Sequence, residues 1–341
     1  MTQERPPAVA ASYARCLLDY LREQGIDPAR LYPAAQIATV SAADLYKSMP
    51  LSEWAAMFSR AVEATGDIDL PLKVGMSVRT THLGMLGFVL MNCINLGEVA
   101  QQLARYHRLI GDTSGAQIVR REHSAELCWV WPHAEQPYPV FQQCQLATRM
   151  NFARWLSGRP LRADAWFSFP RPADTGLYEP IFGGELHFDQ PEIKLVFPME
   201  TFEVPVTTAN PALRPIAEGQ ASEVLARISG EAPFIRQLRQ VLAQDLAAGR
   251  ASREIAAAHL NLSTRTLHRR IEAHGTSFRA VLDSVRCEQA RSLLTESRCP
   301  LAEIAFMLGY TEQSTFQQAF KRWTGMTPGD YRSRHTLRRS A

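Results

Sequence analysis

The chain carries one short pattern twice near its carboxyl end, and this repetition restricts the fold more than any other feature. The first copy is EIAAAHLNLSTRTLHRRI at residues 254–271, and the second is LAEIAFMLGYTEQSTFQQAFKRW at residues 301–323. The run that starts at Thr266 corresponds to the run that starts at Thr315, 49 positions later. Each copy reads as a short helix, a tight turn and a second helix. We therefore predict two helix-turn-helix units in tandem.

The turn of each unit can be predicted from its residue types. Ala257 and Ala305 each lie four positions before a turn residue, which is Asn261 in the first copy and Gly309 in the second. A small alanine lets the two helices cross closely. Glycine, and asparagine better than most other residues, adopts the left-handed backbone that ends a helix. We expect both residues to take that conformation.

Each second helix has a predicted cap and a predicted buried stripe. Ser263 is placed to cap the first with its hydroxyl, and we expect Thr311 to cap the second. Apolar residues four apart should face the core, and they are Leu267 and Ile271 in the first copy and Phe316 and Phe320 in the second. The opposite stripe should face outward: Arg265, His268 and Arg269 in the first copy, and Gln313, Ser314, Gln317 and Gln318 in the second.

The outward residues have the hydrogen-bond donors that read DNA. Arginine can bridge O6 and N7 of guanine, and glutamine can bridge N6 and N7 of adenine. Polar residues on a helix exterior are often only solvated, and a single copy would not decide between the two interpretations. Two tandem copies with matching stripes favour a protein that binds double-stranded DNA.

Residues 232–334 resemble the DNA-binding region of the AraC/XylS family of bacterial transcription regulators. The segment from Gly325 to Arg332, placed just after Ala319-Phe320-Lys321-Arg322, is similar to the closing signature of that family. The resemblance implies an all-α domain of two helix-turn-helix lobes joined by one long helix. Residues 278–296 suit that helix, because their apolar residues form a helical stripe.

The resemblance also implies how such a domain is used. The second helix of each lobe would enter successive segments of the major groove, and Lys321 and Arg322 would meet phosphates. The base-reading residues would be Arg265, Thr266, His268, Arg269, Gln313, Ser314, Gln317 and Gln318. Family members are usually activators that contact RNA polymerase. In the first lobe the chain departs from the family pattern, since Asn261 replaces a common glycine and Arg270 lies beside the buried stripe.

Charge is divided unevenly along the chain. Residues 231–341 hold 17 Lys and Arg against 10 Asp and Glu, whereas the preceding 230 residues hold 20 against 24. A basic end suits contact with phosphates, which supply much of the affinity of DNA-binding proteins.

The start of the chain lacks the pattern of a secretory signal, and the longest apolar stretch, residues 83–97, is shorter than the roughly 20 residues of a membrane span. We therefore expect a bacterial cytoplasmic protein without a membrane partner.

The chain shows no sign of a cofactor or metal site. Six cysteines are scattered without C-x-x-C spacing, so we interpret them as small buried residues in a reducing compartment. The histidines of the amino-terminal part lack ligand spacing, and no nucleophile elbow, P-loop or dinucleotide fingerprint occurs. Gly84 and Gly87 fit close helix packing better than a phosphate cradle. We expect no cofactor, no metal ion and no enzymatic activity.

Residues 1–210 have the pattern of a mixed α+β domain. Helices are predicted at residues 8–24, 51–65, 83–95, 97–110 and 138–157. Strands are predicted at residues 116–121, 125–131, 164–169, 186–189 and 193–197. Prolines at 211 and 215 mark a linker at residues 211–230, which includes a connecting helix over residues 216–228, and the DNA-binding domain follows at residues 231–335.

This amino-terminal part resembles the effector-binding domain of one AraC/XylS subgroup. The run Thr81-His82-Leu83-Gly84-Met85-Leu86-Gly87, followed by Ala104-Arg105-Tyr106, carries the resemblance, whereas the mostly-strand pattern of the arabinose regulator's sensor is absent. The resemblance implies a small-molecule effector of unknown identity. The residues that we choose as effector-binding flank this motif: Arg79, His82, Tyr106 and His107.

A set of aromatic residues could line a pocket or fill the core, and core filling is the more common use of such residues. The set is Trp129, Trp131, Trp166, Phe167 and Phe188.

Two alternatives to an effector-responsive regulator stay open. A DNA-repair alkyl acceptor can carry a similar helix-turn-helix pair, but it needs clustered cysteines near its amino end, where Cys16 stands alone. A ligand-independent DNA-binding protein whose amino-terminal domain only mediates dimerisation is the second alternative. Ligand-induced thermal stabilisation would distinguish it from an effector-responsive regulator. Whether the chain forms a homodimer is left open by its sequence.

Overall fold

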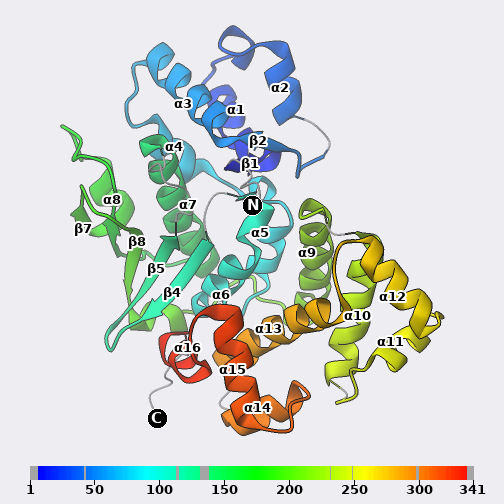
Figure 1. Cartoon of the computed structure of the whole chain (residues 1–341). Helices are drawn as coiled ribbons and strands as arrows, with labels where there is room; N and C mark the ends of the chain where they lie inside the picture. Colours follow the sequence, from blue (N-terminus) through cyan, green and yellow to red (C-terminus); the bar gives the residue numbers. More distant parts are fainter. Residues whose placement is uncertain are drawn as a thin grey trace. The chain divides into compact units, whose positions relative to one another are not determined.

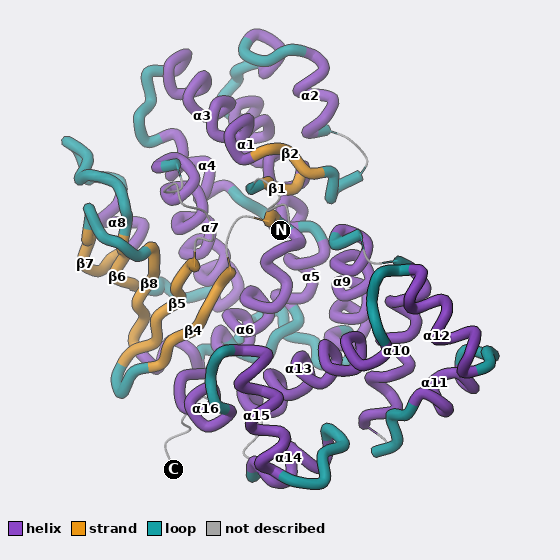
Figure 2. The backbone as a smooth tube through the Cα atoms, viewed as in Figure 1, coloured by secondary structure: helices purple, strands orange, loops and turns teal. Residues whose placement is uncertain are grey.

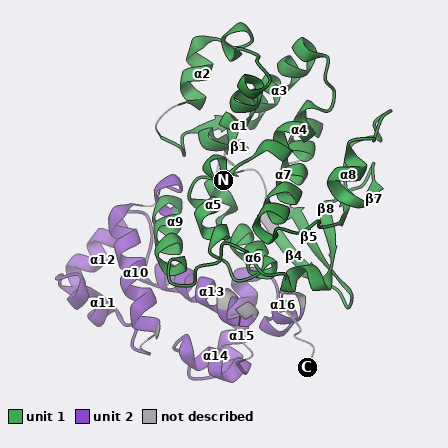
Figure 3. Ribbon diagram, turned by 180° about the vertical axis from the view of Figure 1, so that it is seen from behind, with its two compact units in different colours: residues 1–225 green, residues 226–341 purple. Residues whose placement is uncertain are grey.

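The computed structural model describes residues 7–41, 44–112, 115–130, 138–230, 232–247, 249–296 and 299–335. The chain divides into two compact units, residues 1–225 and residues 226–341 (Figure 3). Helices are the most frequent element in both units, and all of the strands in the described segments belong to the first unit (Figure 2).

The first unit is an α+β fold (Figure 1). Its helices are α1 (Ala11–Glu23), α2 (Ala34–Val40), α3 (Leu51–Thr65), α4 (Leu70–Ser77), α5 (Met85–Met91), α6 (Leu96–Tyr106), α7 (Pro139–Ser157), α8 (Tyr178–Phe182) and most of α9 (Arg214–Ile228). Its strands are β1 (Ala8–Ala10), β2 (Ser48–Pro50), β3 (Gly111–Asp112), β4 (Gly115–Arg120), β5 (Ser124–Val130), β6 (Ala163–Trp166), β7 (Gly183–His187) and β8 (Ile193–Pro198). Short 3-10 helices occupy Pro28–Arg30, Thr80–Leu83, His107–Leu109 and Met199–Glu203.

The strands form two sheets. The larger sheet has the order β4-β5-β8-β6-β7, in which only β6 and β7 run parallel. The smaller sheet has the order β2-β1-β3 and is antiparallel. Both α6 and α7 contact the larger sheet. These two helices and one face of the larger sheet therefore share a core.

The core of the first unit is built around α7. Most of this helix is buried, because it packs against α3, α4 and the sheet. Gly75 brings α4 very close: a Cβ atom there would lie 2.5 Å from the carbonyl oxygen of Cys144. Gly87 is used in the same way, since its added Cβ would lie 2.7 Å from the carbonyl oxygen of Thr80. Gly87 of the sequence motif therefore serves close packing, as predicted, whereas Gly84 has a φ of 56°, a backbone conformation that favours glycine.

Five predicted strands and five predicted helices of this unit are present, with changes at their ends. Residues 8–10 are a strand rather than the first turn of α1, and the helix predicted at residues 97–110 ends at Tyr106. The helices α2, α4 and α8 were not predicted, nor was the smaller sheet. Phe167 and Phe188 are buried in a cluster of aromatic rings, which confirms core filling for these two residues. Trp131 lies outside the described residues.

The second unit consists of helices throughout its described part. They are α10 (Pro233–Ala247), α11 (Arg253–His259), α12 (Thr264–Ala273), α13 (Phe278–Glu296), α14 (Leu301–Met307), α15 (Gln313–Thr324) and α16 (Pro328–His335). This is the predicted arrangement of two lobes and a joining helix, and α13 has the predicted bounds. Val281 and Val285 on its first half pack into a core with α10, α11 and α12. Ala290 and Leu294 on its second half pack into a separate core with α14 and α15.

Candidate nucleic-acid interface and effector cavity

The first helix-turn-helix unit consists of α11, a turn at Asn261 and α12. Asn261 has the expected left-handed conformation, with a φ of 54°. The N–H of Leu262 donates to the carbonyl oxygen of Ala257 at 2.9 Å, which closes the end of α11. Ala257 is 2% exposed, so it lies in the helix crossing as predicted.

The second unit repeats this turn with α14 and α15. Gly309 has a φ of 75°, and the N–H of Tyr310 donates to the carbonyl oxygen of Ala305 at 2.9 Å. Ala305 is 1% exposed. The two copies of the turn therefore share both their backbone conformation and their closing hydrogen bond.

The two units differ by one residue after the turn. Corresponding turn residues are 48 positions apart, but α12 begins at Thr264 and α15 at Gln313, 49 positions apart. Ser263 caps α12, because its hydroxyl accepts from the N–H of Thr266 at 3.2 Å. The prediction that Thr311 caps α15 is wrong. The extra residue puts Glu312 at the cap position, where no side chain accepts a capping hydrogen bond.

The outward face of α12 has the predicted residues. Arg265, His268 and Arg269 are exposed, while Thr266 is half-buried and its hydroxyl lies 2.9 Å from that of Ser263. His268 Nδ1 lies 3.0 Å from a carboxylate oxygen of Glu272, one turn further along the helix. The buried face consists of Leu267 and Ile271, as predicted.

The outward face of α15 corresponds to it at three positions. Gln313, Ser314 and Gln318 are exposed and Gln317 is half-buried. With the offset of 49, Ser314, Gln317 and Gln318 occupy the helix positions of Arg265, His268 and Arg269. Phe316 and Phe320 are fully buried beneath them. Each lobe therefore presents a set of polar side chains at equivalent places on its second helix.

The two cations at the end of α15 are in different surroundings. Lys321 and Arg322 are both exposed. A guanidinium nitrogen of Arg322 lies 3.3 Å from a carboxylate oxygen of Asp283 on α13. Any phosphate contact of Arg322 would therefore compete with this ion pair.

Sequence reasoning did not identify Arg286, which connects α13 to the second turn. Its Nε donates to the carbonyl oxygen of Leu308 at 2.9 Å, and its guanidinium lies 4.7 Å from the ring centre of Tyr310. This arginine thus binds the carboxyl end of α14, where unpaired carbonyl groups attract cations. Arg286 lies more than 20 residues before the turn in the sequence, so no local pattern could link it to the turn.

The first unit contains an apolar cavity of about 60 Å³. Its walls come from α5, α6, α7, the larger sheet and the two 3-10 helices at Thr80–Leu83 and Met199–Glu203. The lining residues are Leu83, Leu86, Leu90, Leu96, Val99, Ala100, Leu103, Leu127, Thr148, Arg149, Phe152, Ala153, Phe197, Thr201 and Phe202. Arg149 is the charged residue of this set, and it is 9% exposed.

The four residues chosen as effector-binding lie elsewhere in this unit. Arg79 is exposed and pairs with Glu23 on α1 at 2.6 Å. His82 is buried, with its Nε2 3.2 Å from a carboxylate oxygen of Asp19, also on α1. Burial lowers the pKa of His82, although the hydrogen bond with Asp19 acts in the opposite direction. This pair therefore joins the motif to α1.

Tyr106 and His107 lie at the end of α6. The hydroxyl of Tyr106 lies 2.9 Å from that of Ser222 on α9, and His107 Nδ1 lies 3.0 Å from the carbonyl oxygen of Ala104. None of the four chosen residues lines the apolar cavity. Their role as effector contacts stays a prediction.

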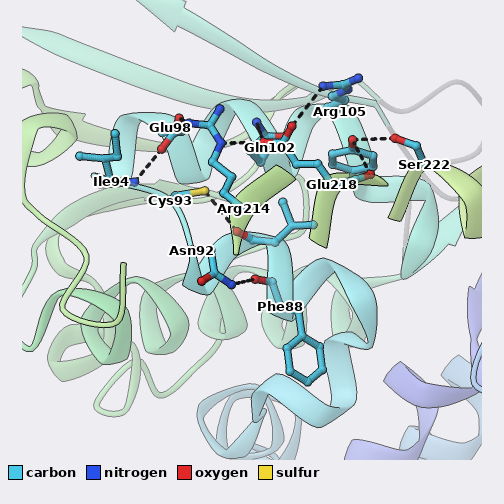
Figure 4. Close-up of polar contacts among 12 residues, drawn as sticks. Phe88, Asn92, Cys93, Ile94, Glu98, Gln102, Arg105, Arg214, Glu218 and Ser222 are labelled. Atoms are coloured by element: carbon cyan, nitrogen blue, oxygen red, sulfur yellow. Dashed lines mark hydrogen bonds and ion pairs between the residues drawn. The ribbon is translucent and has the colours of Figure 1, made fainter. Parts of the chain in front are cut away.

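A polar network joins α6 to α9 within the first unit (Figure 4). Arg214, in the first turn of α9, forms ion pairs with Glu98 of α6 and Glu218 of its own helix. Glu218 in turn accepts a hydrogen bond from Gln102 of α6 at 3.1 Å. The segment that the sequence marks as a linker thus begins with a helix held against α6.

The described residues show neither a metal cluster nor a membrane span. No group of three or more His, Cys, Asp or Glu side chains that could hold a metal ion occurs among them. None of the helices in the same segments is both long and apolar enough to cross a membrane.

Two known sequence families match the chain. The arabinose-binding amino-terminal domain of AraC transcription regulators matches residues 25–206, and a helix-turn-helix domain family matches residues 256–334. The second match covers both turns and both second helices.

Individual relatives agree with these matches. The ornithine utilization regulator of Pseudomonas aeruginosa is 31% identical over 332 residues, which cover 95% of this chain and 96% of the relative. The regulator VqsM of the same bacterium is 26% identical over 271 residues, covering 77% and 83%. Among solved structures, the transcriptional regulator CdpR from Pseudomonas aeruginosa aligns over 94% of this chain and 98% of its own, with a TM-score of 0.47 and 24% identity. The two sequence relatives are transcription regulators rather than enzymes, and the matched families and the 31% identical relative show that the chain belongs to the AraC family of transcription regulators.

Proposed function

We propose that this protein regulates transcription by binding a specific double-stranded DNA site with α12 and α15, and that a small molecule bound by its amino-terminal part changes that binding. The observation that carries the proposal is the matched pair of helix-turn-helix units. Polar side chains that can bind base edges occupy equivalent positions on both second helices, and all of them except the half-buried Thr266 and Gln317 are exposed.

We assign base contacts to eight side chains and phosphate contacts to two. The base-contacting set is Arg265, Thr266, His268, Arg269, Gln313, Ser314, Gln317 and Gln318. Lys321 and Arg322 lie one turn further along α15, where the groove walls would be nearest. The net positive charge of residues 231–341 supports the same assignment, because the phosphate backbone attracts it.

We divide the chain by function into an effector-binding part at residues 1–210, a linker at residues 211–230 and a DNA-binding part at residues 231–335. The apolar cavity supports effector binding, because small-molecule sites are usually lined by apolar side chains with a few polar groups, as this one is. The presence of this cavity favours effector binding over dimerisation alone as the role of the amino-terminal part. We keep a homodimer as part of the proposal.

We further propose that the protein activates transcription through contact with RNA polymerase. The resemblance to the AraC/XylS family supports this, and so does the relative NphR of a Rhodococcus species, which is named a transcriptional activator and is 31% identical over 101 residues. A reporter gene placed behind the bound promoter tests it. Expression that falls when the regulator is deleted supports activation, and expression that rises contradicts it.

The DNA-binding proposal is tested with the full chain and the promoters that it occupies in a genome-wide binding map. Arg269→Ala and Gln318→Ala should each weaken binding to the cognate site by about 1–3 kcal/mol and relax the base preference at one position. Arg279→Ala on α13 and Gln240→Ala on α10 are matched controls, because both residues are exposed but lie outside the second helices. Equal affinity of the unaltered protein for cognate and random DNA at physiological salt would contradict the proposal.

A further inference from the structure

Arg149 is a buried cation that pairs with no carboxylate in the described part of the chain, and its nearest acidic groups are the Tyr13 hydroxyl and the Cys144 thiol. It lies on α7, is 9% exposed and donates from one terminal nitrogen to the amide oxygen of Gln145 at 2.9 Å. Its Nε has no hydrogen-bond partner, and none of the ion pairs between described residues includes it. Burial lowers the pKa of its guanidinium. A buried charge in these surroundings costs free energy unless something pairs with it.

The same arginine lines the apolar cavity. Around it the walls are leucine, valine, alanine and phenylalanine side chains. Of the other polar residues in the lining, Thr148 already donates its hydroxyl to the carbonyl oxygen of Cys144 at 2.7 Å. The centre of the Trp129 ring lies 5.8 Å from the guanidinium, and this cation–π contact stabilises the charge less than an ion pair would. The cavity therefore offers one cationic hydrogen-bond donor, and the rest of its lining is hydrocarbon apart from the hydroxyl-bearing residues Thr148 and Thr201.

We propose that this cavity is the effector site and that it takes a monocarboxylate with a hydrocarbon tail. The carboxylate would bind the guanidinium of Arg149, whose planar donors match its two oxygens. The tail would lie against Leu86, Leu103 and Phe152. This inference rests on the proposed function, because it identifies the chemical class of the effector assumed there.

The cavity argues against some other effectors. The described lining contains no carboxylate that could neutralise an amine, so a cationic amino acid such as ornithine would place its charge beside that of Arg149. Sugars would leave most of their hydroxyl groups without partners. A volume of about 60 Å³ exceeds what one water needs, roughly 10–15 Å³, so the cavity has room for more than a single water.

The test is calorimetric titration of the full chain with butyrate, hexanoate and octanoate, and with hexanol, hexylamine and L-ornithine as comparison ligands. We expect the carboxylates to bind, with an affinity that depends on chain length. Hexanol should bind at least tenfold more weakly than hexanoate, and the two amines should not bind. Equal affinity of hexanol and hexanoate would overturn the role assigned to Arg149, and binding of ornithine in place of the carboxylates would overturn the ligand class.

Variants at Arg149, Arg159 and Ala100 test whether hexanoate binds in this cavity. Arg149→Met should lower hexanoate affinity about 10- to 100-fold, as expected for a lost charge-assisted pair. The same variant should melt at the same temperature as the unaltered protein or higher, because it removes an unpaired buried charge. Arg159→Gln, an exposed arginine beyond the end of α7, is the matched control and should bind hexanoate normally.

Ala100→Leu tests the tail subsite without altering the charge. Its larger side chain should occupy the cavity and weaken octanoate more than butyrate. Hexanoate binding that survives both Arg149→Met and Ala100→Leu would overturn the proposed site.

DNA binding is measured on the same samples. A protein that binds its cognate DNA but no carboxylate disproves this inference alone, whereas one that binds carboxylates but no specific DNA disproves the proposed function.

Discussion

Asn261 and Gly309 have the same left-handed backbone conformation at equivalent turns, with φ angles of 54° and 75°. The strain differs between them, since glycine adopts this conformation freely and asparagine tolerates it. Gly309 also lies close to Arg286: a Cβ atom there would be 3.2 Å from a guanidinium nitrogen. The second turn therefore depends on glycine more strongly than the first depends on asparagine.

We predict that Gly309→Ala lowers the free energy of unfolding of the DNA-binding part by about 1–2 kcal/mol, and that Asn261→Ala lowers it by about 1 kcal/mol or less. The measurement is urea denaturation followed by circular dichroism. Gly329→Ala is the matched control, because this glycine has an ordinary helical conformation and the nearest atom to its added Cβ is 4.0 Å away. A larger loss in the control than in Gly309→Ala would contradict this explanation of the turns.

The single extra residue in the second turn leads to a prediction about caps. Ser263→Ala should lower the free energy of unfolding by about 1 kcal/mol, because it removes the acceptor for the N–H of Thr266. Thr311→Ala should change it by less than about 0.5 kcal/mol, because Thr311 caps nothing. The same denaturation experiment measures both variants. Equal losses would mean that the second helix does start with a threonine cap.

These turns show which parts of the molecule could be predicted from its sequence. The conformation of Asn261 and the bounds of α13 depend on residues close in sequence, so local patterns were sufficient. The strand at Ala8–Ala10 is only three residues long and forms a sheet with equally short partners far along the chain. No periodic pattern can mark such a strand.

The candidate effector site was harder to predict for the same reason. The cavity is lined by residues between Leu83 and Phe202, and Arg149 looks in the sequence like any other helical arginine. Its isolation from carboxylates exists only in the folded chain. The motif around His82 was visible, but its histidine packs against α1 rather than into the cavity.

The ion pair between Arg322 and Asp283 should reduce the contribution of Arg322 to DNA binding. We predict that Asp283→Asn strengthens binding to all DNA sequences alike and steepens the dependence of log K on log salt concentration by up to about 0.9, the value of one phosphate contact. Arg322→Ala should weaken binding uniformly and flatten this slope. Titrations at several salt concentrations measure both effects.

The control for this pair is Glu303→Gln, which removes an exposed negative charge on α14. It changes the net charge of the protein by the same amount as Asp283→Asn. If it strengthens DNA binding equally, the effect comes from net charge and the ion pair has no separate role.

The helix α6 connects the cavity to α9, and this arrangement predicts a route for the response to the effector. Leu96, Val99 and Leu103 of α6 line the cavity, whereas Glu98 and Gln102 of the same helix bind α9. The division between the two compact units falls within α9, after Leu225. A ligand that moves α6 would therefore act directly on the helix that leads into the DNA-binding part.

We predict that Arg214→Met leaves hexanoate affinity within about twofold of its original value but reduces the effect of hexanoate on DNA affinity, which in coupled systems is typically about 5- to 150-fold. The reason is that Arg214 holds α9 to α6 through Glu98 without touching the cavity. DNA titrations with and without hexanoate measure this coupling. Arg227→Met, an exposed position on the same helix, is the matched control. Coupling that is unchanged in Arg214→Met, or lost equally in both variants, would show that the signal does not pass through the α6–α9 contact.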